Sequence, residues 1–340
     1  VGSEMCIRDS VIAVVLIPVV CLYLLTLLLT PKYVNDIPEG SMIAEYYKSE
    51  KNNDVLILGD CEVYENISTV TMWENYGISS YIRGSAEQLI WQSYYLLEDT
   101  LKYEKPQVVI LNVLAMTESD AKNEAYNRMT LDGMKLSKYK IASVRESMTE
   151  EENMASYIFP LLRYHSRWSE LSSEDFRYMW KTPSVTTNGY LMQKGVRPVT
   201  TIPKAAPLAN YTFSDRNMEY LDKIYSLCKD NGINLVLMKA PSVYPHWYDE
   251  WDKQVSDYAY EHGILYLNTI NEAGNIGIDY TTDTFDYGQH LNVEGAEKLS
   301  LYLGEHLVKN FRLTDHRQDE SYKNAWQTIV NKYYEEKQGD

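Results

Sequence analysis

Residues 54–66 read DVLILGDCEVYEN, and this stretch decides the fold. Its first half is a short run of aliphatic side chains, which is typical of a strand that is buried on both faces. Gly59, Asp60 and Cys61 interrupt the run, and a helix is expected to follow them. A strand that turns directly into a helix opens a βαβ unit, so the stretch predicts a parallel sheet.

The same pattern recurs along the chain. Four more short apolar runs predict strands, and stretches with apolar residues at helical spacing lie between them. These runs are SSYIRG (79–84), QVVILNVL (107–114), INLVLMKAP (233–241) and ILYLN (264–268). Alternation of strands and helices is typical of an α/β fold. We therefore predict a parallel sheet of about five strands.

The N-terminal region carries a different signal. Residues 11–30, VIAVVLIPVVCLYLLTLLLT, contain no charged side chain, and a helix of this length crosses about 30 Å of hydrocarbon. No small-residue cleavage site follows, so the segment predicts a retained transmembrane anchor and not a cleaved signal peptide. Residues 1–10, VGSEMCIRDS, match none of the patterns in the rest of the chain. We interpret them as a non-native leader.

The remainder divides into a large domain and a tail. Residues 31–312 are predicted to form the α/β domain, interrupted over about 117–210 by a mostly helical insertion. We expect this insertion to cover the carboxyl ends of the strands, where open α/β sheets place their sites. Residues 313–340 predict a C-terminal helical tail that offers no chemistry.

Composition narrows the function. The formal net charge is −16, from 48 acidic and 32 basic residues, so nucleic acid is excluded as a partner because its phosphates would be repelled. The four cysteines form no CxxC pair and no metal-ligand spacing. The sequence also contains no glycine-rich phosphate loop, so we expect neither a metal nor a cofactor.

Two segments carry candidate chemical groups. Cys61 lies where the first strand gives way to a helix, whose N-terminus favours a thiolate or an oxyanion. DTFDYGQHLNVEGAEKLS (283–300) places His290 just before another predicted helix. Asp286 precedes His290 by four residues, close enough to orient an imidazole. A thiol, an imidazole and a carboxylate are the groups that nucleophilic acyl transfer requires.

These blocks resemble the SGNH (GDSL-like) hydrolase superfamily over about residues 50–310. The resemblance is carried by the GDC turn, by Gly84 after the second strand, by Asn112 at the end of the third, and by the final Asp, HLN and GAEK block. The chain is most similar to a membrane-anchored branch that includes teichoic acid D-alanyl transfer and alginate O-acetylation proteins. The resemblance implies a flavodoxin-like three-layer sandwich. It also implies a single-pass cell-membrane protein whose main domain is extracytoplasmic.

The resemblance assigns roles residue by residue. Cys61 stands where the family has its nucleophilic serine, His290 would be the general base, and Asp286 would set the tautomer of His290. Gly84 and Asn112, with the backbone N–H of Cys61, would stabilise the oxyanion, and Asp60 is a further candidate for oxyanion or substrate binding.

Two assignments carry alternatives. The family places its acid three residues before the histidine, where this chain has Tyr287, so Asp283 is kept as an alternative acid to Asp286. In the insertion, the sequence RYHSRW supplies Arg163, His165 and Arg167 as candidate contacts for an anionic group of the substrate. Ordinary surface pairing on an insertion helix is the other interpretation of these three residues.

The implied function is an ester hydrolase or O-acyltransferase that acts on cell-envelope polysaccharide or teichoic acid, with a membrane-bound O-acyltransferase as a partner. The cysteine in place of serine leaves a second hypothesis, a non-catalytic polysaccharide-binding or assembly module on the same fold. A working site predicts that the thiol of Cys61 reacts at depressed pH, whereas a binding module predicts an ordinary thiol.

Overall fold

The computed structural model describes residues 2–32 and 40–339, with side chains in the first helix from Val14 onward. The described chain divides into two compact units. One contains helix α1 (Gly2–Leu29) and residues 151–185, and the other contains residues 40–150 and 186–339. We call the second the sheet unit, because all five strands belong to it.

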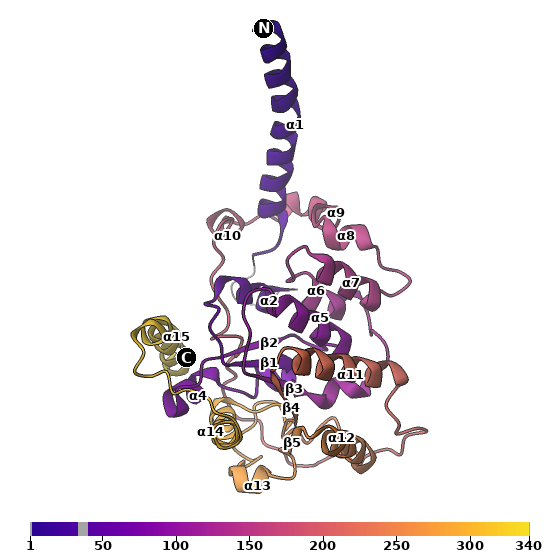
Figure 1. Ribbon diagram of the computed structural model, residues 1–340, viewed down its shortest axis with the longest axis vertical. Helices are drawn as coiled ribbons and strands as arrows, with labels where there is room; N and C mark the ends of the chain where they lie inside the picture. Colours follow the sequence, from indigo (N-terminus) through magenta and orange to yellow (C-terminus); the bar gives the residue numbers. More distant parts are fainter. Residues whose placement is uncertain (1, 33–39, 340) are drawn as a thin grey trace. The chain divides into compact units, whose positions relative to one another are not determined.

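The sheet unit is built on five parallel strands in the order β2-β1-β3-β4-β5 (Figure 1). This confirms the predicted parallel sheet, and the order is that of flavodoxin-like folds. In the register, Ile57 lies opposite Ile82 on one side and Ile110 on the other. The strands are β1 (Val55–Gly59), β2 (Ser80–Gly84), β3 (Val108–Asn112), β4 (Asn234–Lys239) and β5 (Leu265–Asn268).

Helices cover both faces of this sheet. Helices α4 and α14 lie on one side, and α5, α11 and α12 lie on the other (Figure 1). Every residue of β1, β2 and β3 is buried, because neither face meets water. The helical elements of this unit are α2 (Ser41–Glu45), η1 (Tyr46–Lys48), α3 (Cys61–Tyr64), α4 (Thr69–Tyr76), α5 (Ile90–Thr100), η2 (Val113–Thr117), α6 (Glu124–Leu131), α7 (Lys138–Ser147), α11 (Asp215–Asp230), α12 (Asp249–His262), α13 (Ala273–Ile276), α14 (Val293–Asn310) and α15 (Glu320–Gln338).

The region predicted as a helical insertion, 117–210, does not form one body. Its first part, with α6 and α7, belongs to the sheet unit, and so do residues 186–210. Residues 151–185 belong to the unit that contains α1. They form α8 (Met154–Ile158), α9 (Leu161–Tyr164), η3 (His165–Ser169) and α10 (Ser173–Arg177).

Helix α1 contains the segment predicted as a transmembrane anchor. Its side chains at the four successive positions Val14, Val15, Leu16 and Ile17 are all more than half exposed. Across the described residues, none of the helices combines the length and the apolar character that a membrane crossing needs. The side chains of the predicted leader, 1–10, are not described, and residue 1 and residues 33–39 lie outside the described residues.

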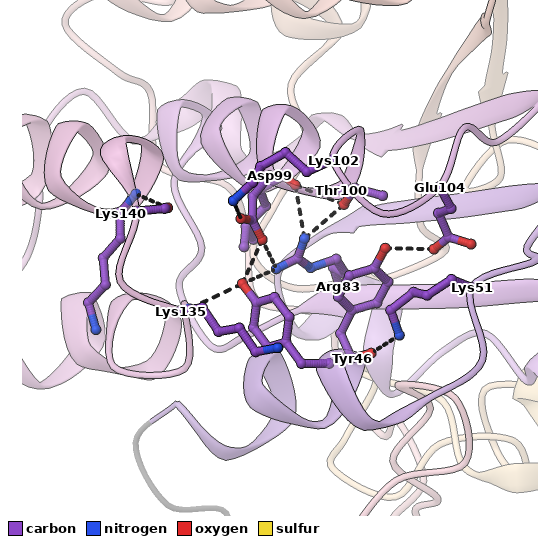
Figure 2. A network of polar contacts seen from close by, with 12 residues as sticks. Tyr46, Lys51, Arg83, Asp99, Thr100, Lys102, Glu104, Lys135 and Lys140 are labelled. Carbon is purple, nitrogen blue, oxygen red and sulfur yellow. Dashed lines mark hydrogen bonds and ion pairs between the residues drawn. The ribbon is translucent and has the colours of Figure 1, made fainter. Parts of the chain in front are cut away.

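A buried ion pair ties β2 to α5 and η1 (Figure 2). The side chains of Arg83 and Asp99 are both fully buried, with Nη2 of Arg83 lying 3.2 Å from Oδ2 of Asp99. Arg83 also donates to the hydroxyl of Thr100 at 2.8 Å and to that of Tyr47 at 3.1 Å. The guanidinium lies over the ring of Tyr46, 4.2 Å from its centroid. These contacts compensate the loss of hydration that a buried charge suffers.

The C-terminal tail packs on the sheet unit. Trp326 of α15 is 2% exposed and stacks on Trp73 of α4, with ring centroids 4.9 Å apart and planes 4° apart. Nε2 of His316, which precedes α15, lies 3.0 Å from Oδ2 of Asp54. The tail therefore completes the core of this unit.

Candidate functional site

A cavity of about 390 Å³ lies at the carboxyl ends of the strands of the sheet unit. Segments that follow β1, β3 and β4 line it, together with the loop before α14. Both ends of the predicted insertion reach it, through Thr117 and Leu208. Its lining includes Asp60, Cys61, Glu62, Tyr244, Trp251 and His290.

The turn after β1 places Cys61 in this cavity. Gly59 has a φ of 156° and packs so closely that an added Cβ would lie 2.7 Å from the Cβ of Asn112. Asp60 then caps α3 by accepting the backbone N–H of Glu62 at 3.0 Å. Cys61 is the first residue of that helix, and it is half-buried.

The loop before α14 brings His290 to the same cavity and pairs it with Asp286. The Nδ1–H of His290 donates to Oδ2 of Asp286 at 2.6 Å, and its backbone N–H donates to Oδ1 at 2.8 Å. Because a carboxylate only accepts hydrogen bonds, the proton of the neutral ring sits on Nδ1. Nε2 is therefore the ring nitrogen that can accept a proton.

The alternative acid, Asp283, is engaged elsewhere. It is 2% exposed, and its Oδ2 lies 2.6 Å from Nζ of Lys298 and accepts the backbone N–H of Asp279 at 2.8 Å. These contacts hold the loop against α14. The structure thus brings Asp286, and not Asp283, to the imidazole.

A second carboxylate, Glu65, also reaches His290, although it was not among the residues predicted from the sequence. Its Oε2 lies 3.2 Å from Nδ1 of His290. Its Oε1 accepts the side-chain N–H of Gln193 at 2.7 Å. The sequence did contain one indication of this contact. Glu65 lies four residues after Cys61, and this spacing places both side chains on one face of a helical turn.

Beneath the cavity lies a buried polar cluster that uses Asn112 differently from the expectation. The side-chain amide of Asn112 donates to Oδ1 of Asp60 at 3.1 Å and to Oε2 of Glu62 at 3.0 Å. Both N–H groups are therefore occupied, so the assignment of Asn112 as an oxyanion donor does not fit this geometry. Nζ of Lys239, at the end of β4, lies 2.5 Å from Oε1 of Glu62. In the sequence, the position of Lys239 at the end of an apolar strand was the feature that could have indicated a buried charged partner.

Gly84 ends β2 beside the same turn. An added Cβ there would lie 3.0 Å from the carbonyl oxygen of Gly59 and 3.0 Å from Cγ2 of Val63. The close approach of the two strand ends requires a residue without a side chain at this position.

The electrostatics of Cys61 differ from the sequence prediction. Burial raises the pKa of its thiol well above the ordinary value, and the nearby carboxylates Asp60, Glu65, Glu62 and Glu87 raise it further. This direction is opposite to the depressed pKa that a preformed thiolate would need. Helix α3, which begins at Cys61, has only four residues, and its N-terminus does not offset this concentration of negative charge.

Two neighbouring groups are also shifted. Burial and the charge of Glu62 raise the pKa of Asp60 to about 7. Burial lowers the pKa of His290, but its hydrogen bond to Asp286 and the charges of Glu65 and Asp286 outweigh burial and raise this pKa above the ordinary value. The imidazole of His290 and the thiol of Cys61 thus both hold a proton more tightly than the free side chains do.

The candidate anion contacts lie in the unit that contains α1. Arg163 is in α9, and His165 and Arg167 are in η3. Arg167 donates to Oδ1 of Asp175 at 2.8 Å and to the carbonyl oxygen of Leu29 at 2.7 Å. These are structural contacts within that unit. Among the described residues, no group of three His, Cys, Asp or Glu side chains is arranged to hold a metal ion.

No protein-family model matches the sequence, and no curated protein matches it. The chain is similar to a solved structure from Desulfitobacterium hafniense described as a lipolytic protein of the G-D-S-L family, at 13% identity, over 75% of this chain and 100% of that chain, with a TM-score of 0.38. It is similar to a GDSL-like lipase from Bacteroides thetaiotaomicron, at 11% identity, over 79% of this chain and 100% of the other, with a TM-score of 0.38.

A third similar structure is described as an acylhydrolase from Bacteroides fragilis. Its identity is 12%, over 83% of this chain and 99% of the other, with a TM-score of 0.39. These are GDSL-like lipolytic or acylhydrolase proteins, from the superfamily that the sequence motifs resemble.

Proposed function

We propose that this chain is an SGNH-type acyl-ester hydrolase or O-acyltransferase that uses Cys61, His290 and Asp286. The observation that carries the proposal is the 2.6 Å hydrogen bond between His290 and Asp286, on a histidine that lines the same cavity as Cys61. A nucleophile, a base and an orienting carboxylate are the groups of a triad, which is recognised by its geometry and not by its sequence order.

The chemistry follows from the charges. Because burial and four nearby carboxylates raise the thiol pKa, Cys61 attacks as a neutral thiol, and Nε2 of His290 removes its proton as the sulfur bonds to the acyl carbon. The alcohol then leaves with that proton, and a thioester remains on Cys61. Water, or an acceptor hydroxyl, attacks the thioester with His290 as base and frees the thiol. We propose the backbone N–H groups of Cys61 and Gly84 as oxyanion donors.

The cavity walls support a carbohydrate ester as substrate. Tyr244 and Trp251 supply aromatic surface, on which a sugar ring can pack. Lys122 also lines the cavity, and its charge is compensated there. Its Nζ lies 2.7 Å from the carboxylate of Glu87 and 3.5 Å from that of Glu118. We propose cell-envelope polysaccharide or teichoic acid as the acyl acceptor or donor.

The test is hydrolysis of p-nitrophenyl acetate and of an acetylated glycan by the full chain in detergent. Cys61→Ala and His290→Ala are each expected to lower kcat/KM by about 10²-fold or more. Tyr260→Ala, at a side chain that is 89% exposed, is the matched surface control. An intact protein without turnover, or turnover untouched by both site changes, would remove the proposal.

A second candidate function is a non-catalytic polysaccharide-binding or assembly module. The observation that favours it is the raised thiol pKa of Cys61, which suits an unreactive side chain. It predicts that an acetylated glycan binds the wild type and Cys61→Ala equally, while neither releases acetate. Calorimetry of binding together with an acetate assay separates the two functions.

We propose further that residues 11–30 attach the chain to the cell membrane in a single pass and that residues 31–312 act outside the cytoplasm, beside a membrane-bound O-acyltransferase. The support is the run of exposed apolar side chains from Val14 to Ile17, which covers successive positions of the helix and hence all its faces. Membrane fractionation of cells, followed by protease treatment of spheroplasts, tests the attachment and the side of the membrane.

A further inference from the structure

Glu65 is a buried carboxylate beside His290 for which the proposed mechanism has no role. It is 8% exposed and directly follows α3. Its backbone N–H donates to the carbonyl oxygen of Cys61 at 3.1 Å, so the positions of the two residues are linked. A buried carboxylate at such a place needs strong partners, since desolvation penalises its charge.

The partners of Glu65 lie on two other segments of the chain. Oε2 lies 3.2 Å from Nδ1 of His290, and Oε1 accepts from Gln193 at 2.7 Å. The next residue, Asn66, accepts the backbone N–H of Leu291 at 2.7 Å. The two residues after the nucleophile's helix therefore each hold one residue of the loop that carries the base.

The segment that contains Gln193 is hydrogen-bonded both to the end of α3 and to the start of α14. The carbonyl oxygen of Gln193 accepts the backbone N–H of Val293 at 2.8 Å. Two residues earlier, the N–H of Leu191 donates to the carbonyl oxygen of Tyr64 at 2.7 Å. Gln193 thus fixes the carboxylate of Glu65 from a segment bonded both to α3 and to the start of α14.

We propose that Glu65 is a positioning residue, which shares the Nδ1–H of His290 with Asp286 and so holds the imidazole with Nε2 toward Cys61. Asp286 belongs to the same loop as His290, so it orients the ring only relative to that loop. Glu65 comes from the segment of the nucleophile and sets the ring relative to the thiol. The consequence for catalysis rests on the proposed function, whereas the link between Glu65 and His290 does not.

Other charged groups face the imidazole as well. They are Glu62 of α3 and its cap residue Asp60, and Glu62 is itself paired with Lys239 of β4. Among these carboxylates, Glu65 and Asp286 are the two that contact the ring. Removing the charge of Glu65 should therefore lower the pKa of His290, because one of two contacting anions that favour the imidazolium is lost.

The experiment follows His290 in the full chain by NMR of labelled histidine, alongside the pH profile of ester hydrolysis. Glu65→Gln keeps the length of the side chain and removes its charge. We expect the titration of His290 and the acidic limb of kcat/KM to move together to lower pH, and kcat to fall about tenfold with KM unchanged, which is a minor share of the 10²–10⁴-fold effect of general bases. Glu261→Gln, on the exposed side of α12, is the control and should change neither.

The outcomes separate the two ideas. If Glu65→Gln leaves the titration of His290 unchanged, the positioning role is wrong, whatever the activity. If the wild type hydrolyses no ester, the proposed function fails, yet the NMR titration still decides the role of Glu65. Should Glu65→Gln fold poorly by thermal melting, Glu65→Asp keeps the charge one methylene further away, and an intermediate shift of the His290 titration is expected.

Discussion

At the scale of single residues, the cysteine in place of serine is the most informative feature of the site. A thiol usually works as a preformed thiolate, which needs a low pKa. Here burial, and then the surrounding carboxylates, raise that pKa. The position is therefore suited to a nucleophile that loses its proton only during attack, which is how a serine hydroxyl works.

Cys61→Ser should accordingly remain an active enzyme. We expect kcat/KM within about tenfold of the wild type, against a loss of about 10²-fold or more for Cys61→Ala, because the same imidazole can take the proton of a hydroxyl. Steady-state hydrolysis of p-nitrophenyl acetate measures this. A serine variant as inactive as the alanine variant would instead indicate a thiolate mechanism.

Asp60 makes a prediction about stability and pH. Its pKa in the folded protein, about 7, lies above its ordinary value of 3.8. The folded state therefore binds this proton more tightly, and the stabilisation it gives is complete below the unfolded pKa and lost as pH rises through the folded one. Asp60→Asn keeps a side-chain oxygen that can accept the hydrogen bonds from Glu62 and Asn112. Because the amide does not titrate, the variant should not lose this stability as pH rises.

Thermal unfolding from about pH 5 to about pH 9 checks the sign of this effect. The melting temperature of Asp60→Asn minus that of the wild type should rise across this range. Asp230→Asn, on the exposed end of α11, should follow the wild type. A difference that is flat with pH, or that falls, would show that Asp60 is not protonated preferentially in the folded state.

At the scale of elements, the sequence predicts all five strands to within a residue or two. DVLILGD, for example, corresponds to β1 at Val55–Gly59, because an apolar run between polar residues has few other ways to be buried. The pairing of His290 with one particular aspartate was left open. Both aspartates lie in one short segment, and only the conformation of the loop decides which one reaches the ring.

Contacts between distant segments were not predictable in the same way. The sequence does not show that Glu62 pairs with Lys239. Glu62 follows β1 and Lys239 ends β4, so their distance depends on the order of the strands in the sheet. The direction of the shift in the thiol pKa of Cys61 also depends on contacts between distant segments. Local sequence gave a helix terminus, whereas tertiary structure surrounds Cys61 with carboxylates, one of them Glu87 from the loop after β2.

The junction of β2 with α5 gives an element-scale prediction. Asp99→Ala removes the partner of Arg83 and leaves a guanidinium that is fully buried (Figure 2). The free energy of unfolding should fall by about 3–5 kcal/mol, the usual effect of breaking a buried ion pair. Urea unfolding followed by circular dichroism measures it.

Lys102 supplies the matched control for that experiment. Its Nζ lies 3.6 Å from Oδ1 of the same Asp99, but its side chain is 39% exposed. Lys102→Ala should change the free energy of unfolding by less than about 1 kcal/mol, because solvent screens an exposed pair. Equal effects of Asp99→Ala and Lys102→Ala would show that the pair with Arg83 contributes no more than a surface contact.

At the scale of the whole chain, the last helix joins the end of the sequence to the first βαβ unit of the sheet. Besides the stack of Trp326 on Trp73, Tyr333 is 1% exposed and donates to Glu297 of α14 at 2.6 Å. The tail therefore contacts both helices on one side of the sheet. It lies outside the residues that line the cavity, so its contribution is to stability and not to catalysis.

Trp326→Ala tests this division. Loss of a stacked, buried indole should lower the free energy of unfolding by about 3–5 kcal/mol, whereas Gln327→Ala, at the exposed neighbouring position, should stay within about 0.5 kcal/mol. Below the melting temperature, kcat/KM per folded molecule should be the same in both variants, because neither residue approaches Cys61 or His290. A Trp326→Ala protein that is stable but slow would show that the tail acts on the site, and one of unchanged stability would show that the tail does not complete the core.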